Sequence, residues 1–94
     1  MTKSSSSVED HGALQLPLEV IKRLAINDSG FIFDPVTGHS FNTNASGLSI
    51  LRQCRVDQNV RRIAEALTAE FAVDLPECER EVVEFASALR RLAT

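Results

Sequence analysis

The sequence has no long apolar run, no excess of positive charge and few cysteines, and each shortage narrows its possible function. No stretch approaches the roughly 20 apolar residues of a membrane-spanning helix, and the serine-rich start lacks the apolar stretch of a secretory signal. The net charge of −3 counts against nucleic acid as the main partner, because binding phosphates requires clustered lysine and arginine. We therefore expect a cytoplasmic protein that binds neither nucleic acid nor membrane.

The two cysteines and two histidines form no metal or redox motif. Cys54 and Cys78 lie far apart, and together with His11 and His39 they match no known spacing of zinc ligands. Two buried, reduced thiols are therefore favoured over a disulfide or a metal site. We expect no metal and no cofactor.

Motifs of catalysis are missing as well. The chain has no glycine-rich phosphate loop, no H-E-x-x-H and no paired histidine and carboxylate at catalytic spacing. His39 beside Ser40 is more typical of the start of a strand than of a nucleophile with its base. The sequence therefore predicts a protein that is not an enzyme.

The spacing at which apolar residues recur changes once along the chain. Its 94 residues suffice for one domain, which we place at 14–94 after a disordered tail at 1–13. Turn signals at 27–30 and 34–38 separate three short strands, the last of which is 39–43. Before them Pro17 leaves two alternatives, an extended arm or a short turn of helix.

After residue 44 the period lengthens to about 3.6, which predicts three helices. Asn44 and Asn59 are expected to cap the first two. Asp74, with Glu77 three residues later, predicts a capping box at the start of the third. The resulting fold class is α+β, a three-stranded antiparallel sheet followed by a three-helix bundle.

The third strand, 39–43, would lie at an edge of this sheet. It contains neither proline nor lysine, and its outward residues Ser40 and Asn42 are small and polar, so the edge is soluble without being blocked. Such an edge can accept an extended peptide by strand addition. The alternative is that a loop, the N-terminal arm or a second copy of the chain covers it.

Residues 24–38 resemble the N-terminal strands of PqqD-like proteins. The resemblance extends to about residue 92. The sequence is most similar to the branch of this family that is found in gene neighbourhoods with an HPr-kinase-like protein. It departs from the family at Thr43, where members often have a buried leucine. The further positions that carry it are Ser40, Phe41, Asn44, Gly47, Ile50, Leu51, Ile63, Leu67, Phe71, Val73, Val82, Phe85 and Leu89.

The resemblance implies a winged-helix-like fold and a peptide chaperone, or recognition element, for ribosomally made peptides that are later modified. In this family the leader of the precursor adds as a strand beside the third strand and lies against the third helix. It is then presented to a tailoring enzyme, which in pyrroloquinoline quinone biosynthesis is a radical S-adenosylmethionine enzyme; an HPr-kinase-like neighbour is the other candidate partner. Carried onto this chain, the peptide-binding strand is His39, Ser40, Phe41, Asn42 and Thr43.

The face of the third helix that would line the cleft follows from its period. If Cys78, Val82, Phe85 and Leu89 fill the core, the neighbouring stripe faces the peptide. That predicted stripe is Glu79, Val83, Ala86 and Arg90, with a shallow apolar centre and charged ends. A solvated helix flank is the alternative.

Other interactions stay open at this stage. DNA binding is a rival because winged-helix topology commonly serves it, although a glutamate-rich third helix would repel phosphates. Arg61 and Arg62 stand in the first turn of the second helix, where the helix dipole disfavours cations. They are either a docking patch for an acidic partner or simply exposed. The strand edge can also pair with its own copy in a homodimer.

Overall fold

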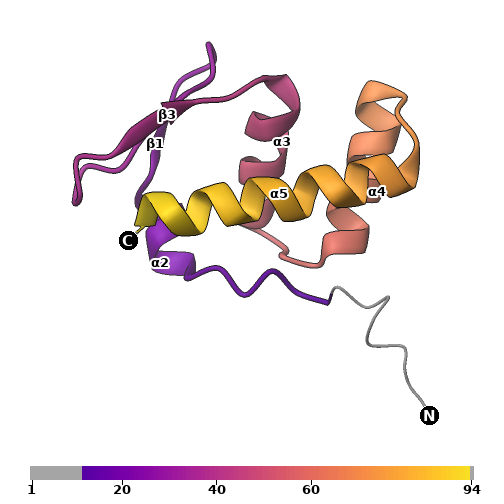
Figure 1. Ribbon diagram of the computed structural model, residues 1–94, viewed down its shortest axis with the longest axis horizontal. Coiled ribbons are helices and arrows are strands. Elements are labelled where there is room, and N and C mark those ends of the chain that lie inside the picture. Colours follow the sequence, from indigo (N-terminus) through magenta and orange to yellow (C-terminus); the bar gives the residue numbers. More distant parts are fainter. Residues whose placement is uncertain (1–11, 94) are drawn as a thin grey trace.

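The computed structural model describes residues 12–93, in which a small sheet is followed by three helices (Figure 1). Residues 1–11, and with them most of the tail expected at 1–13, lie outside this range. The elements in chain order are α2 Leu18–Arg23, β1 Ala25–Ile26, β2 Phe31–Phe33, β3 Ser40–Asn42, α3 Ala45–Cys54, α4 Val60–Phe71 and α5 Leu75–Ala93. The predicted fold class is confirmed, with the segment after Pro17 forming a short helix.

The sheet is antiparallel with the order β1–β2–β3, so β3 lies at an edge as predicted. Gly30 makes the turn into β2 with a φ of 105°, a conformation that side chains with a Cβ rarely adopt. A Cβ at this position would also lie 2.1 Å from the carbonyl oxygen of Thr43. Glycine is therefore required where the start of β2 meets the end of β3.

A buried ion pair anchors the hairpin between β2 and β3. The Asp34 carboxylate is fully buried and accepts hydrogen bonds from the Arg23 guanidinium at 2.9 and 2.7 Å. It also accepts one from the backbone N–H of Val36 at 2.9 Å, which closes the turn. Hydrogen bonding to Arg23 holds the pKa of Asp34 well below its ordinary value. The carboxylate thus ties α2 to the turn that begins β3.

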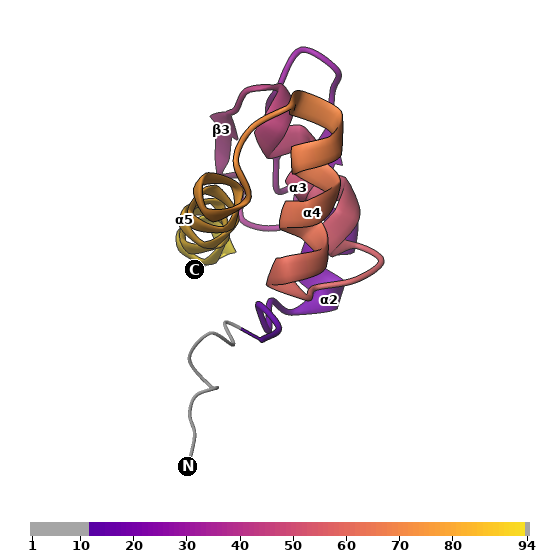
Figure 2. The same ribbon diagram turned by 90° about the vertical axis from the view of Figure 1, so that its right-hand side faces the viewer.

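The starts of α3 and α4 follow the predicted caps, whereas the capping box predicted from Asp74 and Glu77 makes no side-chain hydrogen bond within residues 12–93. The Asn44 side chain accepts a hydrogen bond from the N–H of Gly47 at 2.9 Å, and Asn59 does the same for Arg62 at 3.0 Å. α5 begins at Leu75, directly after Asp74. These three starts let α5 run back across α4 and α3, as Figure 1 shows, and Figure 2 looks nearly along the axis of α5.

The core lies between one face of the sheet and the three long helices. Its fully buried side chains include Ile32 from β2, Leu51 from α3, Ile63 from α4 and Val82 from α5. Cys54 and Cys78 are buried and unpaired, and burial raises the pKa of the Cys54 thiol to about 11. No helix within residues 12–93 has the length and apolar character needed to span a membrane.

The segment before α2 lies against the connection between α3 and α4. The Leu14 N–H donates to the Gln58 carbonyl at 2.8 Å, and the Gln58 side chain bonds both backbone groups of Leu16 at 2.7 and 2.9 Å. Arg90 of α5 donates to the Leu14 carbonyl at 2.8 Å. The described part of this arm therefore leaves the edge of β3 uncovered (Figure 1).

Candidate strand edge and groove

The free edge of β3 presents four unpaired backbone groups. The His39 carbonyl accepts from the Asp34 N–H at 2.8 Å, and the Thr43 N–H donates to the Gly30 carbonyl at 2.7 Å, so these residues face β2. Because backbone groups alternate sides along a strand, Ser40 and Asn42 direct their N–H and C=O groups away from the sheet. No hydrogen bond within residues 12–93 occupies these four groups. The edge can therefore form four more hydrogen bonds with an added strand.

α5 runs alongside β3 in the opposite direction, as three contacts show. The His39 Nδ1 lies 3.0 Å from the Leu92 carbonyl oxygen near the end of α5. The Phe41 and Phe85 rings have their centroids 6.1 Å apart, and the Ser46 hydroxyl donates to Glu81 at 2.8 Å. As the chain advances from β3 into α3, its contacts on α5 move from residue 92 back to residue 81.

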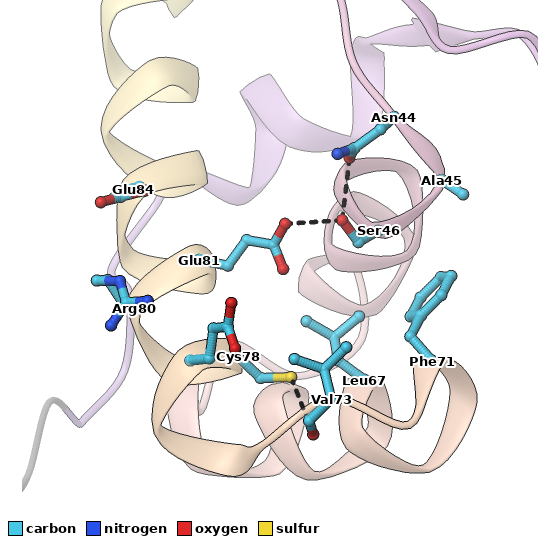
Figure 3. Close-up of a pocket in the computed structure, with 11 residues that line it drawn as sticks. Asn44, Ala45, Ser46, Leu67, Phe71, Val73, Cys78, Arg80, Glu81 and Glu84 are labelled. Atoms are coloured by element: carbon cyan, nitrogen blue, oxygen red, sulfur yellow. Dashed lines mark hydrogen bonds between the residues drawn. The ribbon is translucent and has the colours of Figure 1, made fainter.

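Three adjoining hollows follow this line and together form what we call the groove. The hairpin end, of about 400 Å³, is lined by His39, Ser40, Phe41, Ala88, Arg91 and Leu92. The middle lies between Thr43 and Gly47 on one side and Glu84 and Phe85 on the other. The acidic end, of about 570 Å³, has an apolar floor and is shown in Figure 3 with Glu81 reaching toward Ser46 across it. The floor includes Leu67, Phe71, Val73 and Cys78.

The predicted binding strand lies at this groove. Ser40 and Asn42 are exposed, while Phe41 is half-buried and turned toward Phe85. His39 closes the hairpin end, and Thr43 lines the middle. The five residues of 39–43 therefore all lie at the groove, although only Ser40–Asn42 form β3.

The structure places the predicted stripe on α5 away from the groove. Glu79 lies 3.9 Å from Arg61 of α4, Ala86 is fully buried in the core, and Arg90 reaches the arm at Leu14. Val83, on the same flank, is 38% exposed. None of these four residues lines the hollows beside β3.

The residues of α5 that face β3 are displaced around the helix from that stripe. They are Glu81, Glu84, Phe85, Ala88, Arg91 and Leu92. Because α5 packs closely against α4, the small side chain of Ala86 lies in the core. Phe85, the residue before it, then points toward the sheet. The sequence contained one signal for this arrangement of α5. Phe41 needs an aromatic or apolar partner on the facing helix, and Phe85 supplies it.

Arg61 and Arg62 are engaged within the domain. The Arg61 guanidinium lies 3.2 Å from Glu65, and Arg62 lies 2.5 Å from Asp57. The pKa of Asp57 is lowered by its hydrogen bond to Arg62. The two arginines that suggested a docking patch or a DNA contact are thus already paired with carboxylates of the same domain.

The comparisons with known proteins agree with the fold and with the sequence resemblance. The family model described as "Coenzyme PQQ synthesis protein D (PqqD)" matches residues 30–93. Among solved structures, the chain is similar to "Lasso peptide synthetase B1 complexed with the leader peptide", with a TM-score of 0.62 and 22% identity over 72% of this chain and 81% of that one. A search of curated proteins finds no match.

Proposed function

The chain belongs to the PqqD family, and we propose that it is a non-catalytic adaptor that captures the leader of a precursor peptide by strand addition at β3. The observation that carries this proposal is the open edge of β3, with the unpaired backbone groups of Ser40 and Asn42 beside the groove. Main-chain hydrogen bonds would hold the ligand, and the groove would select its side chains. The similar solved lasso peptide synthetase B1 is complexed with a leader peptide, which supports the same use of this fold.

The proposed contacts follow from the geometry of the edge. Ligand side chains that point to the core side of the sheet would meet Phe41 and, across the groove, Phe85, Ala88 and Leu92 of α5. Those on the other side would project over Ser40 and Asn42, which are exposed. The binding site therefore combines residues 39–43 with the stripe of α5 that faces them.

The captured peptide would then be presented to a tailoring enzyme. As in pyrroloquinoline quinone biosynthesis, a radical S-adenosylmethionine enzyme is the first candidate, and an HPr-kinase-like neighbour is the second. The reading frames next to the gene discriminate between them: a short precursor with a radical enzyme supports the first, and a kinase-like gene alone supports the second.

The proposal places the chain in the cytoplasm, where precursor peptides are synthesised. Buried, unpaired Cys54 and Cys78 suit a reducing compartment. Without ligand, the same edge could pair with its own copy, in which case peptide and homodimer would compete for Ser40 and Asn42.

A displayed library of random linear peptides tests the function and does not require the natural ligand to be identified first. After selection on the immobilised protein, an enriched peptide is titrated into isotope-labelled protein while the amide resonances are followed by NMR. We expect the largest shifts at Ser40 and Asn42, whose N–H groups become bonded to the ligand. If enriched peptides shift amides elsewhere and leave these two unchanged, strand addition at β3 is wrong.

A further inference from the structure

The groove changes charge along its length. The hairpin end carries the basic side chains His39 and Arg91, and the Phe41 ring lies against Phe85 where this end meets the middle. Toward the other end the wall formed by α5 carries three carboxylates and one guanidinium. These are Glu77, Glu81, Glu84 and Arg80. A ligand that follows β3 therefore passes from negative through apolar to positive surroundings.

The register of an added strand decides which ligand side chains meet these surroundings. In an antiparallel pair, a ligand residue bonded to Ser40 or Asn42 places its side chain on the same face as theirs, away from the groove. The ligand residues opposite Thr43, Phe41 and His39 then face the groove, at positions i, i+2 and i+4 of the ligand. They meet the acidic wall, the two phenylalanines and the basic end in that order.

The spacing of the protein charges fits this register. Residues 84 and 91 of α5 are about 10 Å apart along the helix axis, and residues 81 and 91 about 15 Å, at roughly 1.5 Å per residue. Positions i and i+4 of an extended strand are about 14 Å apart at roughly 3.4 Å per residue. One ligand cation and one ligand anion, four positions apart, can therefore reach both ends of the groove together.

We infer that this groove selects leader peptides with an ordered pattern: lysine or arginine at i, a large apolar residue at i+2 and aspartate or glutamate at i+4. This inference rests on the proposed function and names the class of peptide that it would take. β3 runs toward the acidic end of the groove. In a ligand that pairs antiparallel with β3, the N-terminal part therefore lies at that end, and the cation precedes the anion in the ligand sequence. The cation contributes more than the anion, because the α5 C-terminus places the negative end of the helix dipole near the hairpin end.

Two synthetic peptides of identical composition test the order. One carries lysine, leucine and glutamate at i, i+2 and i+4 in a threonine background, and the other exchanges the lysine and the glutamate. Exposed ion pairs are individually weak, but the reversed order replaces attraction with repulsion at both ends, so we expect the first peptide to bind roughly tenfold more tightly at low salt, a difference of about 1.4 kcal/mol. The difference should shrink as the ionic strength rises.

Matched protein variants identify the wall responsible. Glu84→Lys places a cation in the groove and should abolish or invert the preference. Glu79→Lys makes the same charge change on the opposite flank of α5, beside Arg61, and should leave the preference unchanged. Both variants are checked for an unchanged fold by circular dichroism.

Two outcomes overturn the inference and separate it from the proposed function. If both peptides shift the Ser40 and Asn42 amides with equal affinity, the charge order is wrong while strand addition stands. If neither peptide binds at β3, the charge pattern is also wrong, and the proposed function is then judged by the peptides that the displayed library enriches.

Discussion

Asn42→Pro removes one hydrogen-bond donor from the edge of β3 without touching the sheet. The Asn42 N–H points away from β2, and proline is tolerated on an edge strand where the missing N–H faces solvent. The bond from the Thr43 N–H to the Gly30 carbonyl, at 2.7 Å, remains. We expect the variant to fold and to bind peptide more weakly.

The size of the effect follows from the lost hydrogen bond. A net protein hydrogen bond is worth about 1 kcal/mol, and leaving the ligand carbonyl buried and unsatisfied raises the cost to as much as about 3 kcal/mol. At about 1.4 kcal/mol per tenfold, the Kd for a peptide enriched from the displayed library should rise between roughly fivefold and roughly a hundredfold. Isothermal titration calorimetry measures this directly.

The matched control is Asn42→Ala, which removes the side chain and keeps the N–H. Its Kd should stay within about twofold of the unmodified protein, because the exposed Asn42 side chain makes no hydrogen bond within residues 12–93 and surface substitutions away from such contacts are small in effect. A folded Asn42→Pro protein with unchanged affinity would refute strand addition at β3. Should that variant fail to fold, Ser40→Pro removes the other outward donor and answers the same question.

Three further predictions concern the frame around the groove. Gly30→Ala should lower the thermal midpoint, at a cost of about 1–3 kcal/mol from its positive φ alone, and an unchanged midpoint would mean that the turn adapts freely. Ala86→Lys should unfold the domain because this position is fully buried. Val83→Lys, three residues away and partly exposed, should alter neither stability nor peptide affinity. A loss of peptide affinity in folded Val83→Lys would instead support the α5 stripe predicted from the sequence. Asp34 has a folded pKa below its unfolded one, so the stability it contributes is complete above about pH 4 and is lost as the pH falls toward the folded pKa. Thermal midpoints measured from neutral to acidic pH should show that loss in the unmodified protein and less of it in Asp34→Asn, and equal slopes would contradict it.

Local signals were sufficient for the sheet and the helix starts. The turn at 27–30 is closed by the Asn27 side chain, which accepts from the Ser29 N–H at 2.8 Å, and Asn44 and Asn59 cap α3 and α4. Each of these features depends on residues within a few positions of one another. The edge position of β3 also follows locally, because three strands joined by tight turns leave the third with one neighbour.

The rotation of α5 could not be obtained in the same way. Phe85 and Ala86 are adjacent and both apolar, so a period of 3.6 accommodates either one in the core. The choice depends on the space left by α3 and α4 and on the need of Phe41 for a partner, and both are tertiary effects. The anchoring of Arg23 to Asp34 and of Leu16 to Gln58 was missed for the same reason, since each joins segments that only the fold brings together.

Two small residues set the width of the groove's middle. A Cβ at Gly47 would lie 1.9 Å from the Thr43 hydroxyl oxygen and 3.1 Å from the Phe85 ring, so α3 approaches β3 and α5 as closely as a glycine allows. A leucine in place of Thr43 would extend into the hollow that Thr43, Gly47 and Phe85 line. The smaller threonine leaves room in this hollow for the long cationic side chain that the proposed ligand would place opposite Thr43, beside Glu81 and Glu84 of α5.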